Sequence, residues 1–179
     1  MSRTRIVSAS AALLLVAACA PTLGPPPPPP PPRGPPPSAG AFRAEDFSWS
    51  AVPGPGRIEG RLAYKAGQVR YSCSGAGVVL TPETPWTRRR MTILYTSAER
   101  AALPADEVRA RTPSAPSGDY SAFVKRTVCD QNSRFSFSGL ASGAWYVITV
   151  AKPVGGPGPD IAIMKRVEVR GGRVVAVDL

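Results

Sequence analysis

Residues 130–150 read DQNSRFSFSGLASGAWYVITV, and this stretch decides the fold class. It begins with a turn signal at 130–133. Phe135 and Phe137 follow, and they share one face of a strand because side chains alternate along β-structure. The run 145–150 is apolar on both faces, as in a central strand that is covered on both sides. The stretch therefore predicts a turn between two antiparallel strands, followed by a fully buried strand.

Short strands separated by Gly and Pro continue this pattern in both directions. We predict further strands at 57–64, 69–73, 78–80, 91–95, 123–128, 161–164, 167–169 and 174–179. Gly171 and Gly172 mark a tight turn before the last of them. Many short strands with turn signals between them indicate an all-β fold, a single Ig-like or transthyretin-like β-sandwich of about seven strands.

One short helix is expected within this pattern. Thr96 and Glu99 have the spacing of a capping box ahead of 100–103, and Pro104 is expected to stop the helix. The segment 104–120 then has the composition of a long mobile loop.

The first residues have the layout of a signal peptide. Arg3 and Arg5 precede 6–18, a run of 13 uncharged, mostly apolar residues. A helix needs about 20 such residues to span a bilayer, so this run is too short for a transmembrane segment. We therefore assign 1–18 to a signal peptide.

The run ends in Val-Ala-Ala-Cys at 16–19, which resembles the lipobox of bacterial lipoproteins. That resemblance implies cleavage before Cys19 and lipidation of its thiol, which anchors the chain in a membrane. It also implies the periplasmic face of the outer membrane, since position 20 is Ala and not Asp. An ordinary signal peptide whose apolar run happens to stop at a cysteine is the alternative.

A proline-rich linker follows the cysteine. Residues 21–40 hold twelve of the 22 prolines, eight of them consecutive. Such a run favours polyproline II, so we predict a disordered, proline-rich stalk at 19–40 that acts as a spacer. A ligand for a proline-recognising domain is the alternative. An extended lead-in is expected at 41–55, and the sandwich at 56–179.

The chain is strongly basic, with a net charge of +10 that falls to +8 once Arg3 and Arg5 are removed. This favours anionic partners, such as lipopolysaccharide, teichoic acid or other cell-wall glycans. The alternative is a set of solvated arginines without a partner. Nucleic acid is not expected for an exported lipoprotein.

The tightest basic cluster is Arg88, Arg89 and Arg90 beside Trp86, a possible ligand-binding patch or simply a solvated loop. Tyr71 and Tyr95 could add exposed rings to a carbohydrate site, although burial in the core is the usual place for such rings.

Cys73 and Cys129 remain once Cys19 is assigned to the lipid. An even pair in an exported domain predicts a disulfide, and closing a loop of this length would stabilise the fold by about 4 kcal/mol. Free thiols are the alternative. Two cysteines without histidine cannot form a four-ligand zinc site.

Catalysis has little support in the sequence. The absence of histidine excludes Ser-His-Asp and Cys-His systems. The Gly- and Pro-rich segment 155–159 lacks the Lys-Ser/Thr of a phosphate-binding loop. One carboxylate, Asp130, is weak support for calcium. We therefore predict no enzyme activity, no cofactor and no metal.

Three segments resemble the carboxypeptidase regulatory-like domains, which are transthyretin-like sandwiches close to the collagen-adhesin B-type repeats. They are 77–82 (V-x-L-x-P), 130–137 (D-x-x-G-x-F-x-F, with Ser133 for Gly) and 140–147 (L-P-x-G-x-Y-x-V, with Ala141 for Pro and Trp145 for Tyr). The isopeptide bond of some adhesin repeats is not expected, because the only asparagine, Asn132, lies in a turn.

The resemblance specifies fold far better than function. It is compatible with a non-catalytic, lipid-anchored envelope module that binds a protein or supports an assembly. The alternative is a module that binds carbohydrate or anionic cell-wall glycan.

Overall fold

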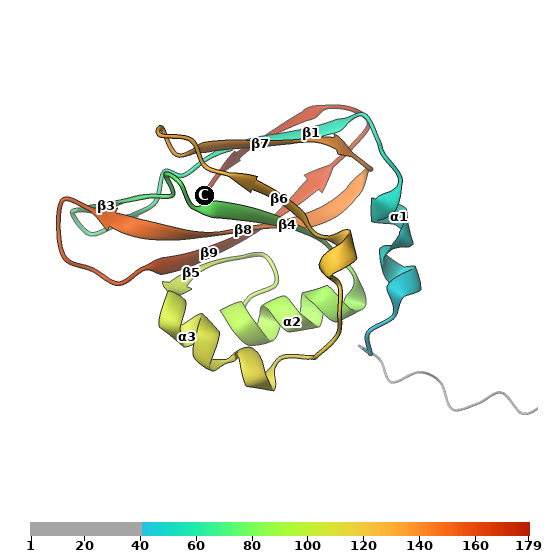
Figure 1. Ribbon diagram of the computed structural model, residues 1–179, viewed down its shortest axis with the longest axis horizontal. Coiled ribbons are helices and arrows are strands. Elements are labelled where there is room, and N and C mark those ends of the chain that lie inside the picture. Colours follow the sequence, from blue (N-terminus) through green and yellow to red (C-terminus); the bar gives the residue numbers. More distant parts are fainter. Residues whose placement is uncertain (1–40) are drawn as a thin grey trace, which may run out of the picture. The chain divides into compact units, whose positions relative to one another are not determined.

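A computed structural model describes residues 41–179. The predicted signal peptide at 1–18, the lipidation site Cys19 and the linker at 19–40 lie outside the described residues. Within 41–179 the chain forms two β-sheets and a layer of short helices (Figure 1). The prediction of an all-β sandwich is confirmed, with ten strands rather than about seven.

The smaller sheet has the strand order β10-β1-β7. Strand β1 (Gly56–Arg61) lies in the middle, parallel to β10 (Val174–Asp178) and antiparallel to β7 (Arg134–Leu140). Ile58, Phe135 and Phe137, among others, point from this sheet into the sandwich and are buried.

The larger sheet is built around the long strand β8. It pairs with β9 along one edge and with β4 along the other, while its C-terminal end pairs with β3. The sheet contains β2 (Lys65–Ala66), β3 (Val69–Ser72), β4 (Gly77–Pro82), β5 (Arg100–Pro104), β6 (Lys125–Val128), β8 (Gly143–Val154) and β9 (Ile161–Val169).

Strand β8 contributes to two hydrophobic clusters, one on each face. Trp145, Val147 and Ala151 belong to the cluster between the sheets, whereas Tyr146 and Ile148 belong to the cluster under the helices. Alternation of side chains along the strand produces this division. The prediction that this strand is covered on both faces is confirmed for 145–149, whereas Val150 is exposed.

The predicted strand at 91–95 is wrong, because these residues end the helix α2 (Pro85–Tyr95). The helix begins with a capping box in which the Thr84 hydroxyl accepts from the Thr87 amide, and Pro85 occupies its first turn. Met91 and Leu94 pack on the sheet. Read alone, 91–95 is rich in strand formers, but the cap further upstream decides the structure.

The helix predicted at 100–103 is also wrong, since 100–104 forms the strand β5. Thr96 ends α2 in the left-handed conformation at φ 58°, instead of capping a new helix. The segment 104–120, predicted as a mobile loop, contains α3 (Ala105–Ala110) and the 3₁₀ turn η2 (Thr112–Ser114). A further 3₁₀ turn, η3 (Ser121–Phe123), occupies the start of the predicted strand 123–128.

The lead-in at 41–55 is helical rather than extended, with η1 (Ala44–Phe47) followed by α1 (Ser48–Ala51). Aromatic burial explains this difference. Phe47 is fully buried, and the ring of Trp49 lies 5.1 Å from that of Trp145. Trp49 also covers Gly143, at φ 150°, where a side chain would collide with the indole. Gly143 is therefore required here, as its place in the sequence motif indicates.

The predicted disulfide is present between Cys73 and Cys129, with their Cα atoms 5.7 Å apart. Cys73 follows β3 and Cys129 follows β6. Backbone hydrogen bonds join the same two turns, since the Gly75 amide donates to Cys129 and the Cys129 amide donates to Ala76. The bond thus ties neighbouring strand ends together, as the sequence predicts.

Candidate functional site

The three arginines of the predicted patch do not act together. Arg88, Arg89 and Arg90 lie on α2, where successive residues point in different directions around the helix. Trp86, the aromatic member, is fully buried. Trp86 therefore cannot serve as an exposed ring of a ligand-binding patch, and the alternative of a solvated loop is wrong because the three arginines are helical. Ligand binding by the exposed Arg88 and Arg89 stays a prediction.

Arg90 has a packing role. Its guanidinium lies 5.7 Å from the ring centroids of both Trp86 and Tyr120, and Nη1 donates to the carbonyl of Pro116 at 2.7 Å. These contacts hold the segment before β6 against α2. Cation–π contacts of this kind stabilise a fold by roughly 0.5–2 kcal/mol.

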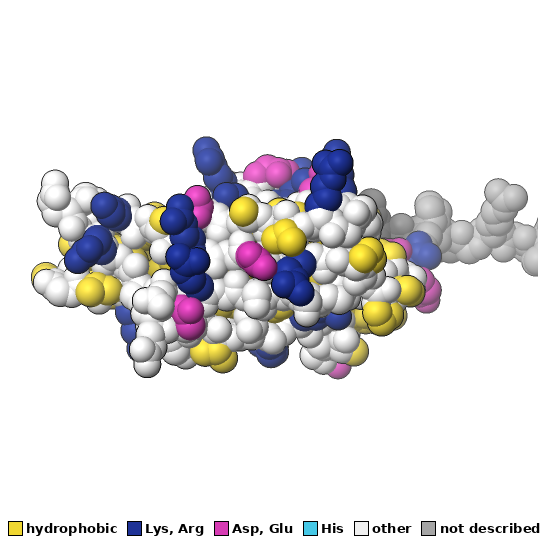
Figure 2. Space-filling model, turned by 90° about the horizontal axis from the view of Figure 1, so that it is seen from above, with side chains coloured by type: hydrophobic (Ala, Val, Ile, Leu, Met, Phe, Trp, Pro, Cys, Tyr) yellow, Lys and Arg dark blue, Asp and Glu magenta, His cyan; other side chains and the backbone are white. Residues whose placement is uncertain are grey.

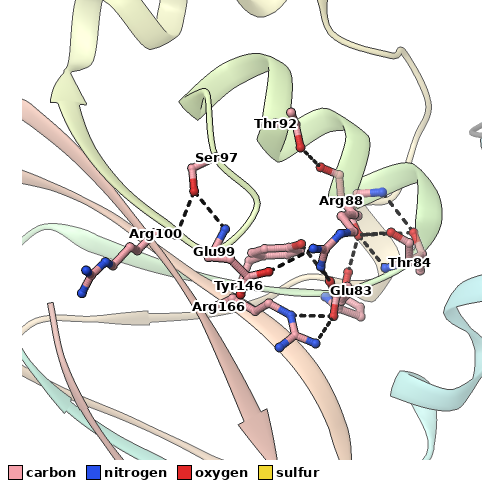
Figure 3. A network of polar contacts seen from close by, with 11 residues as sticks. Glu83, Thr84, Arg88, Thr92, Ser97, Glu99, Arg100, Tyr146 and Arg166 are labelled. Carbon is pink, nitrogen blue, oxygen red and sulfur yellow. Dashed lines mark hydrogen bonds and ion pairs between the residues drawn. The ribbon is translucent and has the colours of Figure 1, made fainter.

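Arg88 belongs to a polar network on the helical side of the large sheet (Figure 3). The carboxylate of Glu83 is bonded to Arg88 at 2.7 Å and to Arg166 at 2.6 Å, and it accepts from the Tyr146 hydroxyl. Glu99 also pairs with Arg88. Burial alone would raise the pKa of the Glu83 carboxyl. Hydrogen bonds from Arg166, Arg88 and Tyr146 outweigh that effect and lower its pKa below the usual value.

Tyr71 and Tyr95 are buried as well, with 8% and 4% of their surfaces exposed. The usual packing role of aromatic rings is therefore the correct interpretation for both tyrosines. Throughout residues 41–179, aromatic side chains are buried or half-buried. The described surface thus offers no exposed ring on which a sugar could stack.

A groove of about 650 Å³ lies on the outer face of the smaller sheet. It is lined by 59–61 of β1, 134–136 of β7 and 176–178 of β10, and by the end of β6. Its polar members are Glu59, Arg61, Thr127, Asp130, Arg134, Ser136 and Asp178. Figure 2 looks onto this side, where basic and acidic side chains are interspersed. We call this surface the sheet groove.

One row across the sheet groove carries most of its charge. Strand register places Arg61 between Asp178 on β10 and Arg134 on β7. Arg61 Nε is 2.6 Å from the Asp178 carboxylate, and this contact lowers the pKa of Asp178. Arg134 makes no ion pair with any residue in 41–179. The row holds two arginines and one aspartate, so it carries a net charge of +1, and arginines directly opposite each other repel. With Glu59 and Asp130 included, the sheet groove as a whole holds three carboxylates and two arginines.

The turn between β6 and β7 fixes where Arg134 lies. Asp130 Oδ1 accepts from the backbone amides of Asn132 and Arg134, both at 2.8 Å. This side chain-to-backbone pattern is typical of Asp at turns. Ser136, two residues further along β7, adds an exposed hydroxyl to the next row, opposite Glu59. The sheet groove therefore offers arginine donors beside hydroxyl groups and the carboxylates of Glu59 and Asp130.

Sequence reasoning did not identify this site. The alternation of 57–64, 134–137 and 174–179 already shows that Arg61, Arg134 and Asp178 face outward. It cannot show that they lie in one row, because register between strands distant in sequence is set by the fold.

In residues 41–179, acidic residues and cysteines do not gather into a group that could hold a metal ion. The helices of this part of the chain are all too short or too polar to cross a membrane.

Comparison with known proteins gives a likeness of fold. Neither a protein-family model nor a curated protein matches this chain. A crystal structure from Pseudomonas aeruginosa, described as a "putative carbohydrate binding protein", superposes with a TM-score of 0.55 at 21% sequence identity. The match covers 77% of this chain and 97% of that one. The β-sandwich with its extra helices is therefore an arrangement also found in a solved structure.

Proposed function

We propose that this protein is a non-catalytic, lipid-anchored module of the bacterial cell envelope that binds anionic glycan in the sheet groove. The observation that carries the proposal is the row of Asp178, Arg61 and Arg134 with its unbalanced charge. A carboxylate or phosphate bound there would relieve the repulsion between the arginines, and arginine suits such groups well because it can donate two parallel hydrogen bonds.

Three further observations support this proposal. The hydroxyl groups of Ser136 and Thr127 lie beside the arginines and can bond sugar hydroxyls. A protein of similar fold is described as a carbohydrate binder. The lipobox-like sequence ending at Cys19 would hold the module in the envelope, where such glycans occur. Because the described residues have no exposed aromatic ring, binding should depend on charge and therefore on salt.

The test is affinity electrophoresis of the purified protein in gels that contain polygalacturonate, a uronic acid polymer, with neutral dextran for comparison. We expect retardation in polygalacturonate only, and loss of retardation in moderate salt. Arg61→Ser with Arg134→Ser should abolish it. Arg70→Ser with Arg109→Ser is the matched control, because it removes the same charge from exposed sites outside the groove.

Equal loss of retardation in both double variants would show that the polymer is attracted by net charge alone, and this would contradict the proposal. Equal retardation by dextran would contradict it too. The alternative, protein binding, would be favoured if polysaccharides do not bind but an envelope protein is captured through the same arginines. Exposed Val128 beside the groove is the feature that would suit such a partner.

A further inference from the structure

A second cleft, of about 390 Å³, lies between α2 and the large sheet, on the side away from the sheet groove. Met91 and Leu94 of α2 form one wall. Val79 and Ile148 of the sheet, with Val124 before β6, form the other. This volume and this mainly apolar lining are typical of sites for small molecules. We call it the α2 cleft.

Tyr95 places a polar group in this apolar wall. The residue is 96% buried, as only 4% of its surface is exposed, and its side chain lines the cleft. Its hydroxyl forms no hydrogen bond with another residue of 41–179. Burial, and then the neighbouring Tyr120, raise the pKa of Tyr95 to about 12, so the hydroxyl keeps its proton at neutral pH. The Tyr95 hydroxyl is not among the fully enclosed polar atoms that lack a partner, so it is open to the cleft and can donate to a group that enters it.

The rim of the cleft holds one carboxylate, Asp119, and one arginine, Arg126. Asp119 is already occupied, because its carboxylate accepts from both the amide and the hydroxyl of Ser121, at 3.0 and 2.7 Å. Arg126 of β6 also lines the cleft and is exposed, and it has no acidic partner among the residues described. Arg126 is therefore the charged group at this opening that can pair with an incoming carboxylate.

We propose that the α2 cleft binds a small amphipathic carboxylate. Its apolar body packs between Leu94 and Ile148, and its carboxylate accepts a hydrogen bond from the Tyr95 hydroxyl. Arg126 at the rim attracts the negative charge. This site is separate from the sheet groove and does not depend on the glycan proposal.

Calorimetric titration with decanoate tests this inference. The protein is the full chain with Cys19→Ser, which carries no acyl group that could compete. We expect saturable binding of one decanoate, with decanol weaker. Tyr95→Phe, which removes one oxygen, should weaken decanoate about tenfold. Arg126→Gln should weaken it severalfold, and Leu94→Trp should abolish binding by filling the cleft. Tyr64→Phe, a half-buried tyrosine outside the cleft, is the matched control and should not change the affinity.

Three results would overturn the inference. One is no saturable binding by the starting protein. Another is wild-type affinity in both Tyr95→Phe and Leu94→Trp, which would mean that the Tyr95 hydroxyl bonds only to water. Loss of decanoate binding in the Arg61→Ser, Arg134→Ser variant would place the ligand in the sheet groove and contradict the inference too. Thermal melts of each variant separate loss of binding from loss of fold.

Discussion

Ser133 lies in the left-handed region of backbone space, at φ 57°, where the resembled motif has glycine. The left-handed conformation costs a residue with a side chain about 1–2 kcal/mol. The hydroxyl offsets this cost, because it accepts from the Cys73 amide at 3.2 Å and bonds to Ser72 at 2.8 Å. Serine thus replaces glycine here by adding contacts next to the disulfide.

This balance gives the first prediction. Ser133→Ala loses the hydrogen bonds and keeps the backbone cost, so it should lower the free energy of unfolding by about 1–2 kcal/mol. Ser133→Gly loses the same bonds but removes the backbone cost, and should be about 1 kcal/mol less destabilising. Urea denaturation measures both. Equal stability of the two variants would contradict this account of the turn.

A second prediction at the residue scale concerns Glu83, whose pKa is lowered by its partners. A depressed carboxyl pKa stabilises the fold above the unfolded value, about 4.3 for Glu, and this contribution is lost as the pH falls through the folded value. Glu83→Gln should therefore cost about 2 kcal/mol at pH 7, with the difference from wild type shrinking below about pH 4. A difference that is constant between pH 7 and pH 3 would show that the charge of Glu83 is irrelevant.

At the scale of elements, α2 shows where sequence reasoning fails. The segment 91–95 has strand-forming residues, yet the cap at Thr84 and the sheet surface it meets make it helical. Local propensity is weak, and tertiary packing overrides it. The helix also places Arg88, Arg89 and Arg90 in different environments, although they are neighbours in the sequence.

The role of α2 gives a third prediction. Arg90→Ala should lower the free energy of unfolding by about 1–2 kcal/mol, because it removes the contacts with Trp86, Tyr120 and the Pro116 carbonyl. Arg88→Ala, which removes one half-exposed arginine from the Glu83 network, should cost less, about 1 kcal/mol. Thermal denaturation of the two variants compares them. An Arg90 variant as stable as the wild type would indicate that these contacts of Arg90 contribute nothing to the free energy of unfolding.

The disulfide is the element-scale feature that the sequence predicted correctly. Two cysteines, two turns and a predicted export signal were enough, because Cys73 ends one predicted strand and Cys129 directly follows another. Reduction should lower the free energy of unfolding by about 2–5 kcal/mol. Denaturation with and without reductant measures this, and Cys73→Ala with Cys129→Ala should match the reduced protein. An unchanged denaturation midpoint would contradict the contribution assigned to the bond.

At the scale of the whole molecule, the sandwich follows from alternation and turn signals, whereas the sheet groove does not. The alternation of polar and apolar residues shows which side of a strand faces out. The run of apolar residues at 145–150 was enough to identify the buried strand β8. The row of Asp178, Arg61 and Arg134 joins residues up to 117 positions apart, so only the folded structure brings it together. The helical segment 41–55 was missed for the same reason, since Trp49 is ordered by its contact with Trp145.

The anchor proposal makes a prediction at this scale. Cys19→Ser removes the thiol that would carry the lipid, so the protein should move from the membrane fraction to the soluble periplasmic fraction. Fractionation of cells followed by immunoblotting measures this, and Cys73→Ser with Cys129→Ser is the control that should stay membrane-bound. A Cys19 variant that still needs detergent for extraction would be inconsistent with a lipid anchor at this residue.

Glycan binding in the sheet groove is the central claim, and amide NMR shifts test it most directly. The protein is titrated with trigalacturonate, and shifts of backbone amides report where it binds. We predict saturable shifts concentrated on β1, β7 and β10, with the largest near Arg61, Arg134 and Ser136, and their loss in the Arg61→Ser, Arg134→Ser variant. Shifts confined to other strands or to the helices, or no saturable shifts at all, would contradict the claim.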